Sequence, residues 1–430
     1  MRSLSSKQAE TMKAWSICTL CALLLFPVAV QAAGFGRPVL NGVRAVGMGG
    51  AFVAVADDSS AVYHNPAGLM TLRDAEIMLS VESLFMLRSY KPRDPDGVYG
   101  AKERASAAPF VLPSLFGGAR IKAGRKDYFA FGFGGYPSYG RAVNYKTRPI
   151  SEGTVMSRLG LYEFAPVLAY QMDPRIYIGA SFRIGMGFFT SLQGCGDLLS
   201  CNQRREAVEF TRVEPMLGVG FGYSLGIRVE PIDGFFLGAS YQSGIKVNMK
   251  GNDVVETGGE NFDASIEVPF PQSFSIGLAY RITKDLLISA QYKWVDFSRV
   301  QNLLIDIEGM PLSEDYLNTP YEWKSSHSVH VGVEGRALKS LVLRGGLAME
   351  TPAIPERNRV REFQDGYKMA FDIGASLHFG RWRLDGAIDF LFGDLANGFK
   401  VVDYPDDYRA PGKHYAGGSI TAHIGGAVTF

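Results

Sequence analysis

Serine and histidine lie close together in one short segment, residues 325–330, which has the sequence Ser-Ser-His-Ser-Val-His. A hydrolase uses these residue types when they share one face and a carboxylate orients the histidine. In an extended strand, His327 and His330 would point to opposite faces, because side chains alternate along the backbone. The sequence marks no third member, so we predict no catalytic residue and no enzyme.

Two further patterns could bind a cofactor or a metal. Gly218, Gly220 and Gly222 recur at every second residue, whereas a phosphate-binding loop joins a strand to a helix. The six histidines are scattered along the chain, and a metal site needs its ligands clustered. We therefore predict no cofactor and no metal, and we interpret the glycines as the small face of a strand.

The first 32 residues have the pattern of a secretory signal peptide. Arg2, Lys7 and Lys13 precede an apolar run from Ala14 to Val30, and Ala32 ends a stretch with small residues at the cleavage point. We expect residues 1–32 to be removed on export. Of the four cysteines, Cys195 and Cys201 would remain. Two cysteines so close together in an exported chain predict a disulfide, in preference to a metal pair that lacks a third ligand.

Composition excludes several classes of protein. The chain has 50 glycines in 430 residues, 12% aromatic residues and 20% charged residues, which is not the composition of a disordered chain. Its net charge of +1 makes nucleic acid an unfavourable partner. After residue 32 no apolar run approaches the roughly 18–20 residues of a membrane-spanning helix. The protein is therefore either soluble outside the cytoplasm or a membrane-spanning barrel.

The apolar pattern from residue 74 onward favours the barrel. Phe274, Ile276, Leu278 and Tyr280 alternate with small or polar residues, and similar segments recur to the C-terminus. A soluble sandwich would turn a charged face outward, whereas an apolar outer face and a polar inner face are typical of strands in lipid. Long segments joined alternately by short turns and long loops predict an all-β, 14-stranded antiparallel transmembrane barrel over residues 74–430. The short turns are expected at 124–127, 173–174, 232–234, 283–285, 339–340 and 380, and the long loops at 91–106, 137–156, 193–208, 248–262, 300–320, 352–365 and 394–413.

The last strand ends in Phe430, on the face of Ile424 and Val428. A terminal aromatic residue at this place resembles the outer-membrane assembly signal of Gram-negative barrels. It implies contact with outer-membrane lipid and with the assembly machinery, and hence an outer-membrane location in a Gram-negative bacterium. Tyr292, Trp294 and Phe297 are expected in an aromatic girdle at one membrane interface.

Residues 33–73 lack the strand pattern. Glycines punctuate this segment, and Asp57, Asp58 or Ser59 is expected to cap a short helix that ends before Pro66. Such a segment could form a periplasmic appendage or fold back into the lumen. Because a barrel of fourteen strands is wide enough to need filling, we predict a plug.

The motifs of this segment resemble the N-terminal hatch of the FadL family of outer-membrane transporters for long-chain fatty acids and other hydrophobic compounds. They are Gly47-Met48-Gly49-Gly50-Ala51-Phe52, Ala56-Asp57-Asp58 and Asn65-Pro66-Ala67-Gly68-Leu69. Later segments, including Val268–Ser273, Tyr292–Ser298 and Leu343–Ala348, also resemble that family, so the likeness covers nearly the whole mature chain.

The resemblance implies a passive mechanism. Outer loops capture a hydrophobic ligand, an interior pocket receives it, and a gap beside a kinked strand releases it sideways. By position, Asn65, Pro66 and Ala67 match the hatch motif and would couple occupancy to opening; the alternative is a simple helix stop. The kink would fall in the third strand at Gly132, Gly134 and Gly135, unless these glycines merely accommodate a bulky group in the lumen.

The ligand itself is less defined by the sequence. A fatty-acid carboxylate favours an arginine or lysine, and Arg158 near the top of the fourth strand is the candidate. Arg344 and Lys293 instead favour a structural ladder of charges with Asp372, Asp385 and Asp389. Two alternatives to uptake remain. The first is a FadL-like barrel that serves as a docking or shuttle partner in protein secretion, and the second is a polar diffusion porin, which the plug disfavours.

Overall fold

The computed structural model describes the chain from residue 41 onward, with gaps in the loops. The described residues are 41–92, 97–100, 102–104, 110–123, 126–144, 153–194, 210–257, 260–301, 303, 305–309, 322–359, 365–393, 402–404 and 412–430. The predicted signal peptide and the predicted disulfide between Cys195 and Cys201 lie outside these residues. In the part of the chain so defined, no helix is long and apolar enough to cross a membrane.

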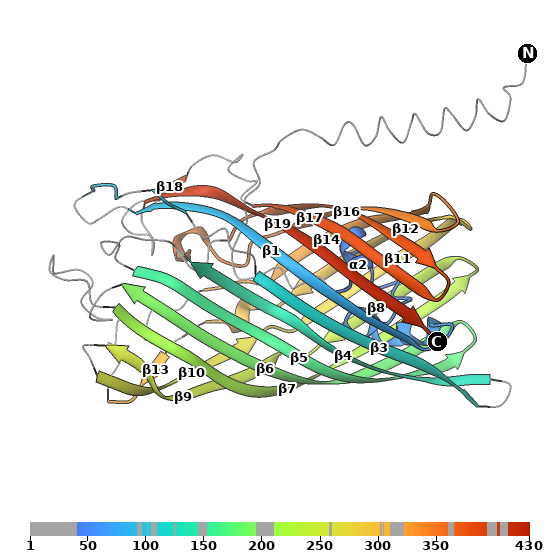
Figure 1. Ribbon diagram of the computed structural model, residues 1–430, viewed down its shortest axis with the longest axis horizontal. Helices are drawn as coiled ribbons and strands as arrows, with labels where there is room; N and C mark the ends of the chain where they lie inside the picture. The colour runs from blue at the N-terminus through green and yellow to red at the C-terminus, as the bar shows by residue number, and fades with distance from the viewer. Residues whose placement is uncertain are drawn as a thin grey trace, which may run out of the picture. The chain divides into compact units, whose positions relative to one another are not determined.

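Fourteen antiparallel strands form a closed barrel (Figure 1). The first strand closes against the last, from Glu76↔Thr429 to Pro92↔Gly412. Two of the fourteen are each divided into two elements. The wall elements are β1 (Glu76–Pro92), β3 (Phe110–Ala123), β4 (Lys126–Asn144), β5 (Gly153–Asp173), β6 (Ile176–Gly194), β7 (Phe210–Ile232), β8 (Phe235–Gln242) with β9 (Ile245–Thr257), β10 (Glu260–Phe270) with β11 (Ser273–Thr283), β12 (Leu286–Val295), β14 (Ser326–Arg336), β15 (Leu341–Glu350), β16 (Lys368–Phe379), β17 (Trp382–Phe392) and β19 (Gly412–Thr429).

Short additional elements lie at the end of the barrel that carries the long loops. They are β2 (Glu103–Arg104), β13 (Ile305–Ile307), β18 (Val402–Tyr404), and the 3-10 turns η2 (Phe297–Arg299) and η3 (Glu356–Asn358). We call this the loop end, and the opposite end, where β1 begins and the chain finishes, the turn end.

The alternating pattern builds the wall as predicted. On β11, Phe274, Ile276 and Leu278 are between 37% and 49% exposed, whereas the alternating residues Ser273 and Ser275 are buried. Only a closed sheet satisfies every backbone group in lipid, so the apolar outer face and the closure of the sheet explain each other. The predicted all-β barrel is confirmed.

The predicted lengths of the outer loops are wrong in places. Residues 248–262 were expected to form a loop, but β9 runs to Thr257 and β10 begins at Glu260. Likewise, β4 continues to Asn144, inside the expected loop 137–156. A strand that extends beyond lipid no longer needs an apolar outer face, which explains β4. Strands β9 and β10 pair chiefly with each other, so they too lack the pattern of strands that face lipid.

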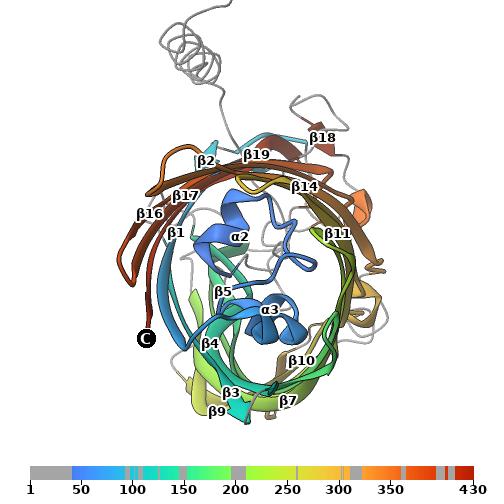
Figure 2. The ribbon, with the colours of Figure 1, turned by 90° about the vertical axis from the view of Figure 1, so that its right-hand side faces the viewer.

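The N-terminal segment lies inside the barrel. Figure 2 shows its helices enclosed by the ring of strands. They are α2 (Val43–Gly47), α3 (Ala61–His64) and the 3-10 helix η1 (Pro66–Thr71). Helix α3 begins after Ser60 rather than at the predicted caps, because the Asp58 side chain accepts the N–H of Ser60 (3.0 Å) and forms a turn before the helix. We call residues 41–72 the hatch.

Candidate functional site

Asn65 joins two parts of the hatch to the wall. Its side-chain N–H groups donate to the carbonyls of Val53 (2.8 Å) and of Ile227 on β7 (3.0 Å). Its Oδ1 accepts the N–H of Ala67 (3.2 Å), so Asn65 caps η1. Pro66 occupies the first position of η1, where a missing N–H costs nothing. Asn65 is fully buried, and each of its polar atoms has a partner.

Glycines in the wall let the hatch approach the strands at backbone distance. A β-carbon on Gly226 would lie 2.9 Å from Cδ of Pro66, and one on Gly179 would lie 2.5 Å from the N of Ala67. Such approach is possible only because glycine has no side chain. Hatch backbone comes equally close at Gly238, Gly332, Gly346 and Gly374, and hatch side chains pack against Gly118, Gly132, Gly277 and Gly425.

Two of the three glycines of the predicted kink lie against the hatch. A β-carbon on Gly132 would be 2.6 Å from Leu69, and one on Gly134 would be 2.8 Å from Val62. The sequence analysis gave this as the alternative to a kink, namely that the glycines accommodate a bulky group in the lumen. Gly135 lies at the end of a strand ladder described below, and the kink itself stays a prediction.

Ion pairs hold the opposite side of the hatch. Arg44 of α2 donates through Nε to Glu334 of β14 (2.6 Å) and pairs with Asp57 of the hatch. Arg344 also binds Glu334 (2.7 Å), a partner that the predicted ladder of Arg344 and Lys293 with Asp372, Asp385 and Asp389 did not include. A third arginine, Arg383, contacts Asp385, Glu76 and Asp58 at 2.8, 3.3 and 3.7 Å. The hatch thus meets the wall closely at glycines around the barrel, and on the side of β14, β15 and β17 ion pairs add to these contacts.

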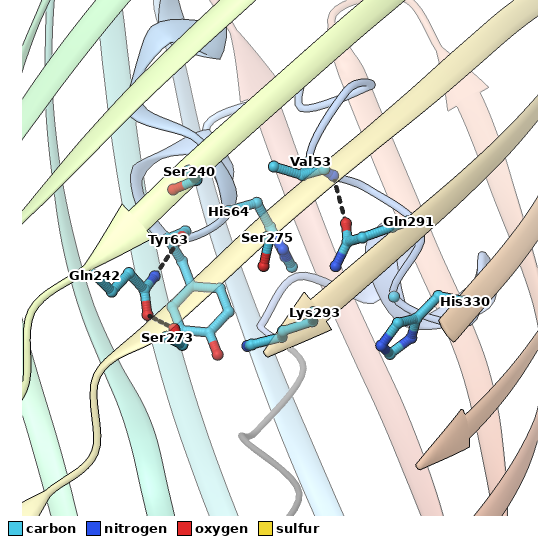
Figure 3. Close-up of a pocket in the computed structure, with 11 residues that line it drawn as sticks. Val53, Tyr63, His64, Ser240, Gln242, Ser273, Ser275, Gln291, Lys293 and His330 are labelled. Atoms are coloured by element: carbon cyan, nitrogen blue, oxygen red, sulfur yellow. Dashed lines mark hydrogen bonds between the residues drawn. The ribbon is translucent and has the colours of Figure 1, made fainter. Parts of the chain in front are cut away.

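A small polar cavity of about 20 Å³ lies between hatch and wall (Figure 3). Gln291 accepts the N–H of Val53 (2.8 Å), and Gln242 donates to the carbonyl of Tyr63 (2.7 Å). A cavity of this size holds about one water molecule, and its lining suits water better than hydrocarbon. The lining residues are Gly50, Val53, Tyr63, His64, Ser240, Gln242, Ser273, Ser275, Gln291, Lys293 and His330.

His64 is electrically neutral at pH 7. Burial lowers its pKa to about 4, although Asn41 and Asp58 oppose this shift. Its Nε2 lies 2.6 Å from the carbonyl oxygen of Asn41, so the neutral ring donates a hydrogen bond from this nitrogen.

The ladder between β3 and β4 ends at Leu115↔Gly135. Beyond this pair, β3 continues against β1 and β4 continues against β5. Asn41 bridges the two strands where they separate. Its Nδ2 donates to the carbonyl of Pro137 on β4 (2.8 Å), and its Oδ1 accepts the hydroxyl of Ser114 on β3 (3.0 Å). The sequence did not identify Asn41, because nothing in its neighbourhood shows that two distant strands separate beside it.

A packed cluster of buried apolar side chains fills the loop half of the barrel, and we call this cluster the apolar chamber. Tyr139, Phe297 and Trp323 form edge contacts in it, and Leu303 lies among them. Phe297 was predicted in an outer girdle, but it is 1% exposed, because the chain turns inward at η2 after β12 ends. The chamber residues are Tyr139, Leu159, Leu161, Phe189, Val213, Met216, Ile245, Val247, Met249, Ala264, Ile266, Val268, Phe270, Val295, Phe297, Val300, Leu303, Ile307, Trp323, Ala353 and Ile354.

Arg158 lies away from this chamber. Its neighbours Ser157 and Leu159 are buried, whereas Arg158 is exposed on the outward face of β5, with its guanidinium carbon 5.9 Å from the ring centre of Phe110. This placement gives no support for a contact with a ligand inside the barrel. Lys293, in contrast, points inward and lines the polar cavity.

The two histidines of segment 325–330 and the terminal Phe430 are the remaining residues singled out in the sequence. His330 points inward to the carbonyl of Gly49 (2.6 Å), and His327 points outward to the hydroxyl of Tyr292 (2.7 Å), so they occupy opposite faces as expected. Phe430 is exposed, and its N–H donates to the carbonyl of Ala75 (2.9 Å). Its role in assembly stays a prediction. Among the residues described, no cluster of potential ligands could hold a metal ion.

Comparison with known proteins agrees with this geometry. A family model described as outer membrane protein transport protein (OMPP1/FadL/TodX) matches residues 23–423. A Neisseria meningitidis serogroup B protein, named as an outer membrane protein, is 23% identical over 387 residues, which cover 79% of this chain and 81% of that protein. The crystal structure of a Pseudomonas aeruginosa FadL homologue matches with a TM-score of 0.75 and 17% identity, over 93% of this chain and all of that one. The Pseudomonas putida toluene transporter TodX matches with a TM-score of 0.68 and 17% identity, over 93% and 99% of the two chains.

Proposed function

Because this chain belongs to the OMPP1/FadL/TodX family of outer-membrane transport proteins, we propose that it takes up long-chain fatty acids and releases them sideways into the membrane. It is a passive channel for hydrophobic compounds in the outer membrane of a Gram-negative bacterium and not an enzyme. The turn end is then periplasmic, and the loop end faces the outside.

The observation that carries the proposal is the separation of β3 and β4 beside the hatch. The glycine contacts of the hatch obstruct a straight path along the barrel axis. A ligand in the apolar chamber therefore needs another exit, and the wall is unpaired where Asn41 bridges Ser114 and Pro137. Movement of the segment Asn65-Pro66-Ala67 would shift the hatch and withdraw this bridge.

Lys293 supports a fatty acid as the ligand. It lies on the inward face of β12, two residues before Val295 of the chamber, and it lines the polar cavity. A carboxylate near this ammonium group would leave its acyl chain among apolar residues, where burial contributes about 25 cal/mol per Å². This position makes Lys293 a better partner than Arg158. TodX is described as a toluene transporter, so a neutral hydrocarbon is the competing ligand.

The first experiment identifies what the barrel carries. The protein is purified in mild detergent, and bound small molecules are identified by mass spectrometry, in parallel with an Asn65→Ala/Pro66→Ala variant. Long-chain fatty acids in the parent and fewer in the variant are expected. An empty barrel that retains a protein partner would instead favour the docking or shuttle role in secretion.

A second experiment tests the lateral exit. Asn41→Ala removes both hydrogen bonds across the gap, and we expect uptake of a labelled fatty acid by cells to rise at least threefold. Ser289→Ala, which removes a wall hydrogen bond to Leu278, is the matched control and should leave uptake unchanged. Equal uptake by the parent and by Asn41→Ala, at equal amounts of folded barrel, would contradict the exit route.

A further inference from the structure

One hairpin of the barrel leaves the wall. Strands β9 and β10 pair with each other from Ile245↔Phe270 outward. Strand β7 pairs with β8 up to Ser224↔Gln242 and is bonded to Ser243, and it meets β9 again at Leu217↔Lys250. Between these points, where both strands are fully described, no ladder pair joins β7 to β9.

In this interval β9 lies over the inner face of β7 instead of beside it. A β-carbon on Gly220 or Gly222 would lie 2.7 or 2.8 Å from the side chain of Ile245, and one on Gly218 would lie 2.8 Å from the carbonyl carbon of Asn248. The alternate glycines of β7 therefore accommodate a strand that has folded inward. This close approach explains the period-two glycine pattern seen in the sequence.

The two faces of the hairpin differ in polarity. Ile245, Val247 and Met249 are buried in the apolar chamber. On the opposite face Lys246 pairs with Glu267 (2.8 Å), and both side chains are more than half exposed. The hairpin thus forms one wall of the chamber while turning a charged face to water.

A buried ion pair is hydrogen-bonded to the backbone at the point where the hairpin leaves the wall. Arg183 of β6 and Glu163 of β5 are 2% and 0% exposed and are joined by two hydrogen bonds of 2.6 Å. The remaining Nη1 of Arg183 donates to the carbonyl of Ser243 (2.8 Å), between β8 and β9. A guanidinium held by both oxygens of a carboxylate has a fixed direction, so Glu163 aims Arg183 at this carbonyl.

We propose that hairpin β9–β10 is a gate folded over the apolar chamber and that Arg183, oriented by Glu163, is the positioning residue that holds its hinge. Outward rotation about Ser243–Gly244 and Pro271–Gln272 would uncover Ile245, Val247 and Met249 and open the chamber past the free edge of β7. Gln242, beside the hinge, binds the carbonyl of Tyr63, so the gate adjoins the hatch. The purpose of the gate rests on the proposed uptake function, but its position can be measured without a ligand.

The test measures the reactivity of a cysteine at Val247 toward a water-soluble thiol reagent, in a chain with Cys195 and Cys201 changed to serine. The double variant Arg183→Met/Glu163→Gln removes the hydrogen bond to Ser243 without leaving a lone buried charge. We expect Val247→Cys to react at least tenfold faster in this background. Arg183→Lys keeps the positive charge but cannot bind both oxygens of Glu163 at once. The reaction rate of Val247→Cys in this background should lie between those of the other two proteins. Val342→Cys, buried on β15 far from the hairpin, is the control and should not change.

A second variant leaves the ion pair intact. Gly220→Ala places a methyl group against β9 and should also accelerate the reaction at Val247→Cys, whereas Gly386→Ala, where a β-carbon meets nothing within 4 Å, should not. An unchanged rate in both the double variant and Gly220→Ala would overturn the proposal, as would an equal rise at Val342→Cys. Faster labelling without any fatty-acid uptake by the parent would support the gate and count against the uptake function.

Discussion

The two halves of the barrel interior are held together by different kinds of contact. In the turn half, Arg44, Asn65 and the wall glycines fix the hatch through hydrogen bonds, ion pairs and backbone approach. In the loop half, the chamber is held chiefly by apolar packing. The described residues place buried ion pairs there at the hinge of one hairpin, between Arg183 and Glu163, and at the chamber's edge, between Lys368 and Asp365 and Glu350. Directional contacts define one geometry, whereas apolar packing tolerates changes of shape. The difference is suited to a channel that must stay sealed at one end and accept ligands at the other.

The largest effect should follow from breaking the charged side of the hatch. Arg44→Met leaves buried carboxylates with one partner fewer, and breaking a buried pair costs about 3–5 kcal/mol. Denaturant unfolding in lipid vesicles measures this free energy. Arg175→Met is the control, since its pair with Asp233 is exposed and should contribute less than about 1 kcal/mol. Equal losses for the two variants would show that the ion pairs do not hold the hatch.

Acid should weaken the same half of the molecule through His64. Its pKa in the folded protein is about 4, below the unfolded value of about 6.5, so the unfolded chain binds more protons between these values. Stability is therefore fully present above pH 6.5 and falls as pH drops toward 4, by at most roughly 3 kcal/mol. His64 faces Phe52, Tyr63, Asp58 and Lys293.

The contribution of His64 is the difference between the parent and His64→Gln. Subtraction is needed because other acidic groups of the protein also gain protons as pH falls. Unfolding free energies at pH 7, 6, 5 and 4 should converge for the two proteins as the pH is lowered. Parallel curves would mean that His64 titrates normally and does not make the seal sensitive to acid.

A smaller effect is expected where the hatch touches the wall. Gly226→Ala places a methyl group against Asn65 and Pro66, and overpacking of this kind costs about 1–3 kcal/mol. The displaced hatch should also let ions pass, so conductance in a planar bilayer should rise well above that of the parent. Gly386→Ala provides the same substitution in open space and should change neither quantity.

The sequence predicted the wall better than its contents. The alternation along strands such as β11 and the short turns were enough to predict the barrel. Lipid requires an apolar outer face on every strand, so each strand shows the pattern in its own sequence. The contacts of Asn41 and of Arg183 with Glu163 could not be found in this way. They arise where β3 separates from β4 and where β9 folds inward, and both events depend on strands far apart in the chain.

The predicted function of individual residues shows the same division. The sequence identified Asn65 through its motif, and its cap is a local interaction that a short segment can specify. Arg158 was selected for its charge and its position along a strand, but alternation from Ser157 to Leu159 turns it outward. Lys293 faces inward beside the chamber, a relation that requires the register of β12 and the path of the chain after it.

The smallest effect should come from the chamber itself. Met249→Leu keeps volume and apolarity, and such exchanges usually cost less than about 1.5 kcal/mol. Unfolding free energy and conductance should therefore stay close to the parent, while competition between fatty acids of different lengths for uptake should shift, because a branched side chain replaces a flexible one. A loss as large as that of Arg44→Met would show that the chamber is as closely specified as the hatch, and the contrast between the two halves would then fail.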